Sequence, residues 1–328
     1  MVGKRKVVVM DAVTDEFEKR WREDLSGLPI ELVLLKDPGV EALEHAVAGA
    51  QILIARRRPI DAALLEAAGT DLRRVIRLSR WPIGVDLGAC QTRNVDVKLV
   101  PQLGCITVAE HAMTLLLMCA RDMIRSHLGV VNGEYRNYDL VPEVTSERSF
   151  AFKWIPVTPV EPYGQTLGIV GFGEIGKELA TRAKAFGMHI LYHDQYRPPA
   201  DIEAELGAEY RELDALLSES DFISLHVPHT PKTEKMIDAA AFKRMKPSAY
   251  ILNACRGGVI DEDAMVVALK SGEIAGAGLD VFVKEPVPYD HPLLELSNVV
   301  LSPHIGGGAG TGRADQRQRL HALIGELA

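Results

Sequence analysis

The sequence predicts an α/β protein built on two doubly wound parallel sheets. Three observations lead to this class. The chain has 328 residues, which is more than one hydrophobic core usually organises. Short apolar runs alternate with segments of helical spacing through the first hundred residues, and a second alternation begins at Leu167. Strands that alternate with helices in this way form parallel sheets covered on both faces.

The first alternation predicts five strands and three helices. The expected strands are KVVVMD, IELVLLKD, QILIAR, RVIRLS and VDVKLV, and the expected helices are EFEKRWREDL, VEALEHAVAGA and DAALLEAA. A long helix is expected over Thr107–Val131, because Thr107 and Glu110 have the spacing of a capping box. This helix is a suitable boundary between two domains.

The second half repeats the pattern after an irregular stretch. Residues 132–165 hold four prolines without a sustained period, which predicts a long surface loop. The expected strands are then LGIVGFG, HILYHD, FISLHVP, AYILNA, AGAGLDVF and NVVLSP, followed by a glycine-rich loop and a last helix. The simplest architecture that these patterns predict is two consecutive α/β units.

The stretch TLGIVGFGEIGK suggests a binding site for a dinucleotide. Gly171, Gly173 and Gly176 fit the pattern GxGxxG, with a strand-like run before it and a helical run after it. Gly171 permits a tight turn, Gly173 lets a pyrophosphate approach the backbone, and Gly176 lets helix and strand pack closely. The amides at the start of the helix would then receive the phosphates.

An acidic residue follows at the expected distance. Asp194 ends the next strand, 18 residues after Gly176, where a carboxylate accepts hydrogen bonds from the ribose hydroxyls. The same charge would repel a 2′-phosphate. NAD is therefore favoured over NADP as cofactor, although Arg197 nearby keeps NADP open.

Three polar residues follow predicted strands in this half of the chain: Arg256, Glu285 and His304. The carboxyl ends of parallel strands meet at one edge of a sheet, so these side chains are expected to converge. Beside a nicotinamide, a histidine can exchange the proton that carbonyl reduction requires. A carboxylate favours its imidazolium form, and a guanidinium can bind a substrate carboxylate.

These segments resemble the NAD-dependent D-2-hydroxyacid dehydrogenases. The resemblance covers nearly the whole chain and is carried by TLGIVGFGEIG, LHVPHTPKTEKMI, LNACRGGVIDEDAM, AGAGLDVF…EP…HPL and SPHIGG. It implies a Rossmann cofactor domain over residues 105–302 and a flavodoxin-like substrate domain formed by residues 1–104 and 303–328. The chain would then cross between the domains twice, and a homodimer is expected.

The resemblance also implies roles for individual residues. Arg256 would bind the carboxylate and carbonyl of a 2-oxo acid, and His304 would be the acid and base, with Glu285 as its partner. Asp280 would hold the nicotinamide carboxamide, Thr233 would face the pyrophosphate, and Val227 and Pro228 would lie near the adenine. The candidate cofactor-binding residues are Gly171, Phe172, Gly173, Glu174, Ile175, Gly176, Asp194, Val227, Pro228, Thr233, Ala254, Cys255, Asp280, His304 and Gly306.

The turn SRWPIG departs from the family pattern. The family usually carries a glycine-rich turn there, whose amides hold the substrate carboxylate, whereas Pro82 has no amide to donate. Arg80 and Trp81 are candidate substrate-binding residues, through their amides or through the Arg80 charge. Alternatively, Trp81 packs inward as part of the core. Arg80 and the run Arg56–Arg58 suggest a second anionic group on the substrate, although such a run is more often a solvated loop.

Composition excludes several classes. The net charge of −8 argues against a nucleic-acid partner. The four cysteines form no CxxC pair and no zinc pattern, so no metal is expected and a reducing cytoplasm is favoured. The apolar stretch in MVGKRKVVVMDA is too short for a secretory signal, and MTLLLMCA is too short to span a bilayer. Two alternatives to a hydroxyacid dehydrogenase stay open: an NAD-sensing, corepressor-like binding protein, and a phosphonate- or formate-oxidising relative.

Overall fold

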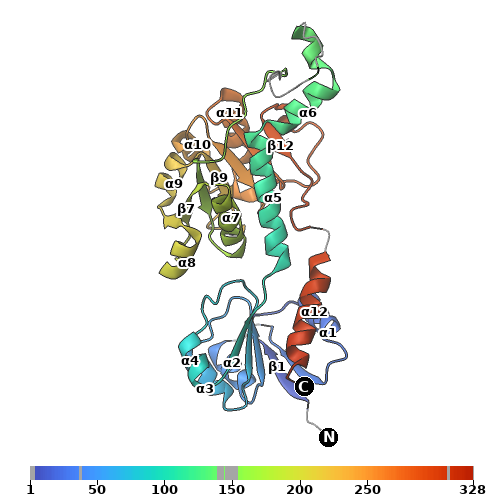
Figure 1. Ribbon diagram of the computed structural model, residues 1–328, viewed down its shortest axis with the longest axis vertical. Coiled ribbons are helices and arrows are strands. Elements are labelled where there is room, and N and C mark those ends of the chain that lie inside the picture. Colours follow the sequence, from blue (N-terminus) through green and yellow to red (C-terminus); the bar gives the residue numbers. More distant parts are fainter. Residues whose placement is uncertain (1–3, 37–38, 139–143, 145–153, 309–310, 328) are drawn as a thin grey trace. The chain divides into compact units, whose positions relative to one another are not determined.

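The computed structural model describes residues 4–36, 39–138, 144, 154–308 and 311–327. The chain divides into two compact units (Figure 1), one formed by Met1–Ile106 with Gly308–Ala328 and the other by Thr107–Gly307. We call them unit 1 and unit 2. Each unit contains one parallel sheet with helices on both faces, as the alternation predicts.

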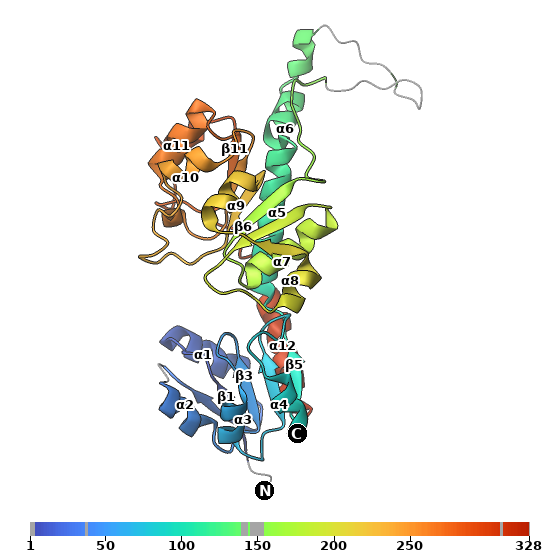
Figure 2. The ribbon, with the colours of Figure 1, turned by 90° about the vertical axis from the view of Figure 1, so that its left-hand side faces the viewer.

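Unit 1 has a five-stranded sheet in the order β2-β1-β3-β4-β5, which is the flavodoxin-like order. Its strands are β1 (Arg5–Val9), β2 (Ile30–Leu34), β3 (Ile52–Ala55), β4 (Arg74–Arg77) and β5 (Asp96–Leu99). Its helices are α1 (Asp15–Asp24), α2 (Val40–Val47), α3 (Ala62–Ala68), α4 (Leu87–Thr92) and α12 (Thr311–Gly325). Figure 2 shows α2 and α3 beside the strands of this unit.

The last helix, α12, belongs to unit 1 although the whole of unit 2 precedes it in sequence. Leu320 and Ile324 of α12 are buried in the same apolar cluster as Val7 and Val9 of β1. The expectation of two consecutive α/β units is therefore wrong. The apolar side chains of α12 are buried only because the chain returns to the first sheet.

Unit 2 has a seven-stranded sheet in the order β12-β11-β10-β9-β6-β7-β8, with the Rossmann arrangement on either side of β6. Its strands are β6 (Thr166–Val170), β7 (His189–His193), β8 (Ala208–Tyr210), β9 (Phe222–Leu225), β10 (Tyr250–Asn253), β11 (Gly276–Leu279) and β12 (Val299–Leu301). Its helices are α5 (Leu103–Ala120), α6 (Met123–Val131), α7 (Glu174–Ala185), α8 (Ala200–Leu206), α9 (Leu213–Glu219), α10 (Ala239–Arg244) and α11 (Glu262–Ser271). Short 3₁₀ helices are η1 (Glu134–Tyr138), η2 (Gly257–Val259) and η3 (Pro292–Glu295).

Strand β11 shows how the two faces of this sheet are covered. Ala277 and Leu279 belong to the apolar cluster that also contains the buried side chains of α9, α10 and α11. Gly278 points to the opposite face, where a Cβ atom would lie 3.0 Å from Cβ of Leu115 and 3.2 Å from Sγ of Cys119. The small residue therefore lets α5 pack directly against the strand.

The structure corrects several expected elements. The helix predicted over Thr107–Val131 begins at Leu103, so no capping box forms, and Glu110 instead pairs with Arg182 of α7. The predicted single helix is in fact two helices, α5 and α6, because Asp122 between them adopts a left-handed conformation (φ 46°). Strand β8 and helix α4 are additional elements. The loop predicted over 132–165 contains η1, and residues 139–143 and 145–153 lie outside the described residues.

Candidate active site

The three glycines between β6 and α7 occupy three different environments. Gly171 has φ +95°, and a Cβ atom there would lie 2.6 Å from the carbonyl oxygen of His226. A Cβ atom at Gly176 would lie 2.4 Å from the carbonyl oxygen of Gly171. A Cβ atom built on Gly173 would meet no atom of the described residues within 4 Å, and Gly173, the N-cap of α7, has no side chain with which to cap the helix. Gly171 and Gly176 therefore build the turn, whereas Gly173 leaves space beside a helix N-terminus.

Asp194 ties this turn to the end of β7. Its Oδ2 accepts a hydrogen bond from the amide of Phe172 (2.7 Å), and its Oδ1 accepts one from the amide of Tyr196 (3.0 Å). A carboxylate has about four acceptor positions, so two remain for a ligand's hydroxyl groups. Asp194 thus holds the glycine-rich turn and keeps capacity for a diol.

Arg197 is engaged within unit 2. Its Nη2 lies 2.9 Å from Oε1 of Glu203, and its guanidinium lies over the ring of Tyr210 at 5.0 Å from the centroid. The hydrogen bond to Glu203 is the main reason that the pKa of Arg197 is raised. Its positive charge is therefore already compensated on this edge of the sheet.

The loop after β9 contains the residues expected near the adenine and the pyrophosphate. Val227 and Pro228 follow His226, whose Nε2 lies 2.8 Å from Oγ of Ser224. The hydroxyl of Thr233 donates to the carbonyl oxygen of Pro228 (2.5 Å) and accepts from the amide of Thr230 (2.9 Å). The hydroxyl of Thr233 therefore links the beginning of this loop, at Pro228 and Thr230, to its later part.

Arg256 is exposed at the start of η2, just after β10. Its carbonyl oxygen accepts a hydrogen bond from Nδ2 of Asn253 (3.0 Å), and the Oδ1 atom of Asn253 accepts one from the amide of Cys255 (3.0 Å). Asn253 is 1% exposed. It was not among the candidate residues of the sequence analysis. With Ala254 between them, Asn253 and Cys255 form a bonded turn that positions Arg256.

Glycine is required directly after this arginine. A Cβ atom at Gly257 would lie 2.0 Å from the carbonyl carbon of Phe282, which no relaxation of a side chain could relieve. The loop of Arg256 therefore lies against the loop that carries Glu285. Burial raises the pKa of Cys255 to about 11, so the thiolate nucleophile is scarce near neutral pH.

His304 and Glu285 form a hydrogen-bonded pair. Nδ1 of His304 lies 2.6 Å from Oε2 of Glu285, and Oε1 of Glu285 accepts from the amide of Phe282 (3.0 Å). The hydrogen bond from His304 is the main reason that the pKa of Glu285 is lowered. The charge of Arg256 contributes to the same lowering, so the structure brings all three predicted residues into one electrostatic neighbourhood.

Asp280 anchors the loop on which His304 lies. Its carboxylate is 1% exposed and accepts hydrogen bonds from Oγ of Ser302 (2.6 Å), the amide of Ile305 (2.9 Å) and the amide of Gly306 (2.8 Å). Two of these donors bond to Oδ1 and one to Oδ2. Oδ2 therefore keeps one acceptor position, which fits the amide group that Asp280 is expected to hold.

His111 of α5 also reaches this carboxylate. Its Nε2 lies 2.8 Å from Oγ of Ser302 and 3.2 Å from Oδ1 of Asp280. Neither His111 nor Ser302 was a candidate in the sequence analysis. His111 lies inside the expected helix and Ser302 precedes the SPHIGG histidine by two positions, so neither stands out without the fold.

A cavity of about 410 Å³ borders the histidine–glutamate pair. Glu285 and His304 contribute the titratable groups of this cavity. The rest of its wall is largely apolar and includes Phe282, Val287, Leu294 and Leu301. An apolar wall reduces the competition of water for hydrogen bonds to a ligand. The pair thus lies at the edge of a space that can hold a small molecule.

In unit 1, Trp81 is 2% exposed and packs as part of the core, which was one of its two alternatives. Its amide donates to Oγ of Ser79 (2.9 Å), so this amide is already used within the turn. Arg80 is exposed, and its guanidinium lies 5.8 Å from the Trp81 ring centroid. Of the two residues, Arg80 is the one with an accessible polar group.

The Arg56–Arg58 run is held by an acidic residue. The carboxylate of Asp11 accepts hydrogen bonds from the amides of Arg56, Arg57 (2.8 Å) and Arg58 (3.2 Å). A cavity of about 480 Å³ opens beside it and is lined in part by Asp11, Arg56 and Arg57. Both arginine side chains therefore border a space within unit 1.

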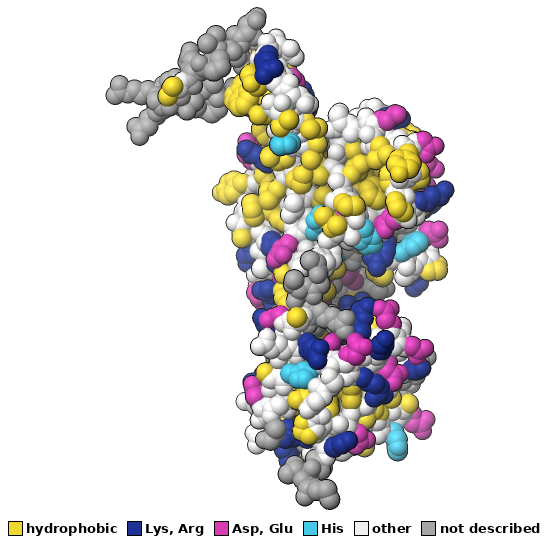
Figure 3. All heavy atoms as spheres, turned by 90° about the vertical axis from the view of Figure 1, so that its right-hand side faces the viewer, with side chains coloured by type: hydrophobic (Ala, Val, Ile, Leu, Met, Phe, Trp, Pro, Cys, Tyr) yellow, Lys and Arg dark blue, Asp and Glu magenta, His cyan; other side chains and the backbone are white. Residues whose placement is uncertain are grey.

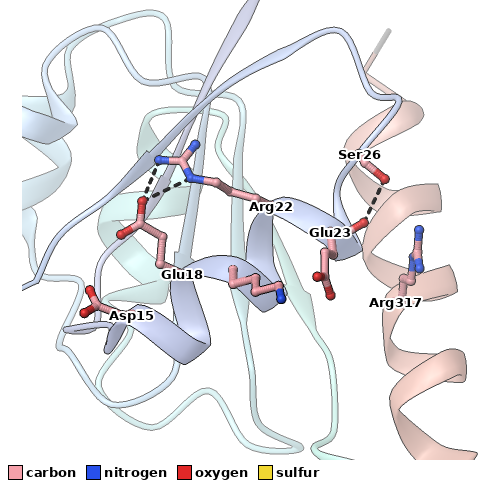
Figure 4. A pocket seen from close by; sticks show the side chains of 7 residues that line it. Asp15, Glu18, Arg22, Glu23, Ser26 and Arg317 are labelled. Carbon is pink, nitrogen blue, oxygen red and sulfur yellow. Dashed lines mark hydrogen bonds and ion pairs between the residues drawn. The ribbon is translucent and has the colours of Figure 1, made fainter.

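A second hollow of unit 1 lies between α1 and α12 (Figure 4). It is lined by Asp15, Glu18, Lys19, Arg22, Glu23 and Ser26 of the α1 region and by Arg317. Arg22 pairs with Glu18 at 2.9 Å, and Ser26 Oγ donates to the carbonyl oxygen of Glu23. Its charges are largely balanced by one another, so it provides no concentrated charge for a ligand.

Among the residues that the structure describes, no group of three or more His, Cys, Asp and Glu side chains has the arrangement of a metal site. Among the described helices, α5 is long and apolar enough to cross a bilayer by length and composition alone, and 44% of it is buried within the protein.

Comparison with known proteins yields consistent matches. A family model described as D-isomer specific 2-hydroxyacid dehydrogenase, NAD binding domain, matches residues 113–306. The glyoxylate reductase of Korarchaeum cryptofilum is 42% identical over 270 residues, which are 82% of this chain and 75% of that protein. The glyoxylate reductase of Thermococcus onnurineus is 39% identical over 92% of this chain and 84% of its own length.

Solved structures match as well. The D-lactate dehydrogenase of Aquifex aeolicus, complexed with NAD and lactic acid, has a TM-score of 0.56 and 26% identity, and the match covers 98% of this chain and 95% of that one. An acyclic imino acid reductase in complex with NADPH and D-Arg has the same TM-score and 25% identity, with 96% and 94% covered.

Proposed function

Because this chain belongs to the D-isomer specific 2-hydroxyacid dehydrogenase family and is an oxidoreductase acting on CH–OH groups, we propose that it reversibly reduces small 2-oxo acids to D-2-hydroxy acids with NADH. The observation that carries the proposal is the His304–Glu285 pair, 2.6 Å apart, in the unit that contains the glycine-rich turn after β6. A histidine whose Nδ1 is bonded to a carboxylate keeps its other ring nitrogen for proton exchange with a substrate, which the reduction of a carbonyl group requires.

The residues of unit 2 fit a nicotinamide dinucleotide. The open space beside Gly173 and the uncapped start of α7 would receive the pyrophosphate, and Asp194 would bind the adenosine ribose. Phe172, Glu174 and Ile175 complete this turn. Val227, Pro228 and Thr233 would border the adenine and pyrophosphate, and Ala254, Cys255, Asp280 and Gly306 the nicotinamide end. Asp194, together with the paired state of Arg197, supports NAD as the preferred cofactor over NADP.

When bound, the reduced nicotinamide supplies a hydride to the 2-carbon of the oxo acid. His304 would donate the proton that the carbonyl oxygen needs, from Nε2, because Nδ1 is bonded to Glu285. Glu285 would fix the orientation of the ring through its hydrogen bond with Nδ1. Arg256 would bind the substrate carboxylate and polarise the neighbouring carbonyl. In the reverse direction, His304 accepts the proton.

The relatives support a small substrate. Glyoxylate is the smallest 2-oxo acid, and the similar proteins named above include glyoxylate reductases. In this proposal unit 1 is the substrate domain and unit 2 the cofactor domain. Arg80 is the unit 1 residue proposed to contact substrate, since the amide of Trp81 is used by Ser79.

We also propose that the protein is a cytoplasmic homodimer. Helix α6 exposes Met123, Ile124, Leu128, Val130 and Val131. Figure 3 shows hydrophobic side chains gathered on this side of unit 2. Association through α5 and α6 would remove this apolar surface from water. Size-exclusion chromatography with light scattering tests it, and a monomer at micromolar concentration would contradict it.

The experiment that tests the activity is NADH oxidation with a panel of oxo acids: glyoxylate, hydroxypyruvate, pyruvate, a phosphorylated oxo acid and a dicarboxylic oxo acid. NADPH with the best acid serves as the cofactor control. We expect turnover of glyoxylate and a preference for NADH. Tight NADH binding without turnover of any acid would favour an NAD-sensing protein. Reduction of NAD by phosphonate or formate in a parallel assay, with no oxo acid reduced by NADH, would favour the other alternative.

A further inference from the structure

We propose that His111 of α5 is a positioning residue for the loop that carries His304. It would act through Ser302 and Asp280, without touching the substrate. The inference rests on the proposed role of His304, but its structural consequence can be measured without any turnover. Residues 107–307 belong to one compact unit, so every contact in this argument lies within unit 2.

The hydrogen-bond pattern determines where the protons lie. An ionised Asp280 only accepts, and the Ser302 hydroxyl lies 2.6 Å from its Oδ1, so this hydroxyl donates to Asp280. Nε2 of His111 lies 2.8 Å from the same hydroxyl oxygen and 3.2 Å from Oδ1. Nε2 must therefore carry a proton and donate it to this pair. His111 thus adds a donor on the Oδ1 side of this buried carboxylate, while Oδ2 keeps its open acceptor position.

The carboxylate of Asp280 in turn binds the two backbone amides that follow His304 in the chain. The amides of Ile305 and Gly306 bond to Oδ1 and Oδ2 of Asp280, and the amide of Ser302 bonds to the carbonyl oxygen of Leu279. The loop is thus fixed two positions before His304 and at the two positions after it. A loss of order at Asp280 would release both amides at once.

His304 needs such support because its backbone is in an unfavourable conformation. Its φ angle is +57°, the left-handed region that residues other than glycine rarely adopt. Such a residue costs about 1 kcal/mol or more unless its surroundings hold it. The bonds from Asp280 to the next two amides supply this constraint, and they keep Nδ1 of His304 in reach of Glu285.

The packing explains why a histidine fits here. Gly278 lets α5 lie close to β11, directly before Asp280, so that a side chain of α5 can reach the strand's end. A Cβ atom at Gly306 would lie 2.9 Å from Oδ2 of Asp280 and 3.3 Å from Cδ2 of His111. The imidazole therefore packs against the loop as well as bonding to its anchor.

The test compares His111→Ala with His111→Gln. The alanine variant loses the donor, and kcat should fall on the order of 10- to 100-fold, the cost of a misplaced catalytic group. The Gln side chain places an amide N–H near the position of Nε2, and kcat should return to within about threefold of the native value. The affinity for ADP-ribose, which lacks the nicotinamide, should stay unchanged in both variants, since the glycine-rich turn is not altered.

Hydrogen exchange gives the readout that is independent of turnover. In His111→Ala the amides of Ile305 and Gly306 should exchange faster than in the native protein, without substrate or cofactor. His45→Ala, the same change at an exposed position of α2, is the control and should alter neither exchange nor kcat.

The possible results distinguish a failure of the positioning role of His111 from a failure of the proposed function. Native kcat and native exchange in His111→Ala would overturn the positioning role, as would a Gln variant as impaired as the alanine variant. If the native protein reduces no oxo acid, the proposed function fails, and the exchange data alone then decide whether His111 orders this loop.

Discussion

Nδ1 of His304 lies 2.6 Å from Oε2 of Glu285, although the two residues are 19 positions apart and follow different strands. The carboxylate is itself held by the amide of Phe282, so the acceptor has a defined place before the imidazole bonds to it. This arrangement leaves one ring nitrogen of His304 for proton exchange with a substrate. The mechanism proposed above depends on that division of roles between the two nitrogens.

Replacement of His304 by alanine tests the proton donor directly. We expect kcat for glyoxylate reduction to fall by about 10²- to 10⁴-fold, the usual contribution of a general acid. NADH binding, followed by its fluorescence, and the melting temperature should change little, because half of this side chain is exposed. A variant with near-native turnover would refute the assignment.

The pH profile tests Glu285. The pKa of Glu285 lies below its ordinary value of 4.5, mainly because His304 donates a hydrogen bond to it. Protonation would remove the acceptor, so on the acidic side of the profile activity should be lost as the pH falls through this lowered pKa. The native enzyme should therefore keep its acceptor at about pH 5. Glu285→Gln should have a kcat lower by about tenfold or more and no such acidic limb. A native profile that collapses well above pH 5 would speak against this pair.

The glycine-rich turn offers a set of three matched substitutions. Gly173→Ala meets no atom within 4 Å, so the protein should fold normally but bind NADH more weakly, because the added methyl group enters the space for the pyrophosphate. Gly171→Ala and Gly176→Ala meet backbone oxygen atoms at 2.6 Å and 2.4 Å and should lower the free energy of unfolding by about 2 kcal/mol or more. Isothermal titration and urea unfolding distinguish the two effects. Equal destabilisation by all three would contradict this division.

Acid stability should depend on His226. Burial lowers its pKa to about 4, and its Nδ1 has no hydrogen-bond partner among the described residues. Between this value and the ordinary 6.5, the unfolded chain binds a proton that the folded protein does not. The free energy of unfolding should therefore fall as the pH drops through this window, by up to about 3 kcal/mol.

His226→Gln keeps a group that can bond to Ser224 but does not titrate. Urea unfolding at about pH 7 and pH 4.5 should show a smaller loss of stability for this variant than for the native protein. The same loss in both proteins would mean that His226 is not the group responsible.

The return of α12 to unit 1 can be tested at Arg74. Its buried guanidinium bonds to Asp96 (2.8 Å) and to Glu326 of the C-terminal segment (3.0 Å). Arg74→Met should lower the free energy of unfolding of unit 1 by about 1–3 kcal/mol, with NADH affinity unchanged. Arg20→Met breaks an exposed pair within α1 and should cost less than about 0.5 kcal/mol. Equal effects of the two variants would contradict the structural role of Arg74.

Local signals predicted most of the secondary structure. Apolar runs such as RVIRLS and AYILNA became β4 and β10, and the glycine motif correctly marked the β6–α7 turn. The error at Thr107 has a clear cause: a capping box is a pattern of two residues, whereas α5 begins at Leu103, four residues earlier. The break at Asp122 likewise depends on one backbone conformation that no periodicity reveals.

The sequence by itself determined the α/β class and the family and proposed the residues of the site, because these depend on short-range patterns and on motifs of a few adjacent residues. Only the tertiary structure decided which groups support them. His111 and Ser302 act on Asp280 through contacts between segments far apart in the chain, whereas Asn253 supports Arg256 through a turn of three residues whose hydrogen bonds no sequence pattern reveals. A hydrogen bond depends on distances of about 3 Å, and such distances exist only after the sheet has brought the ends of its strands together.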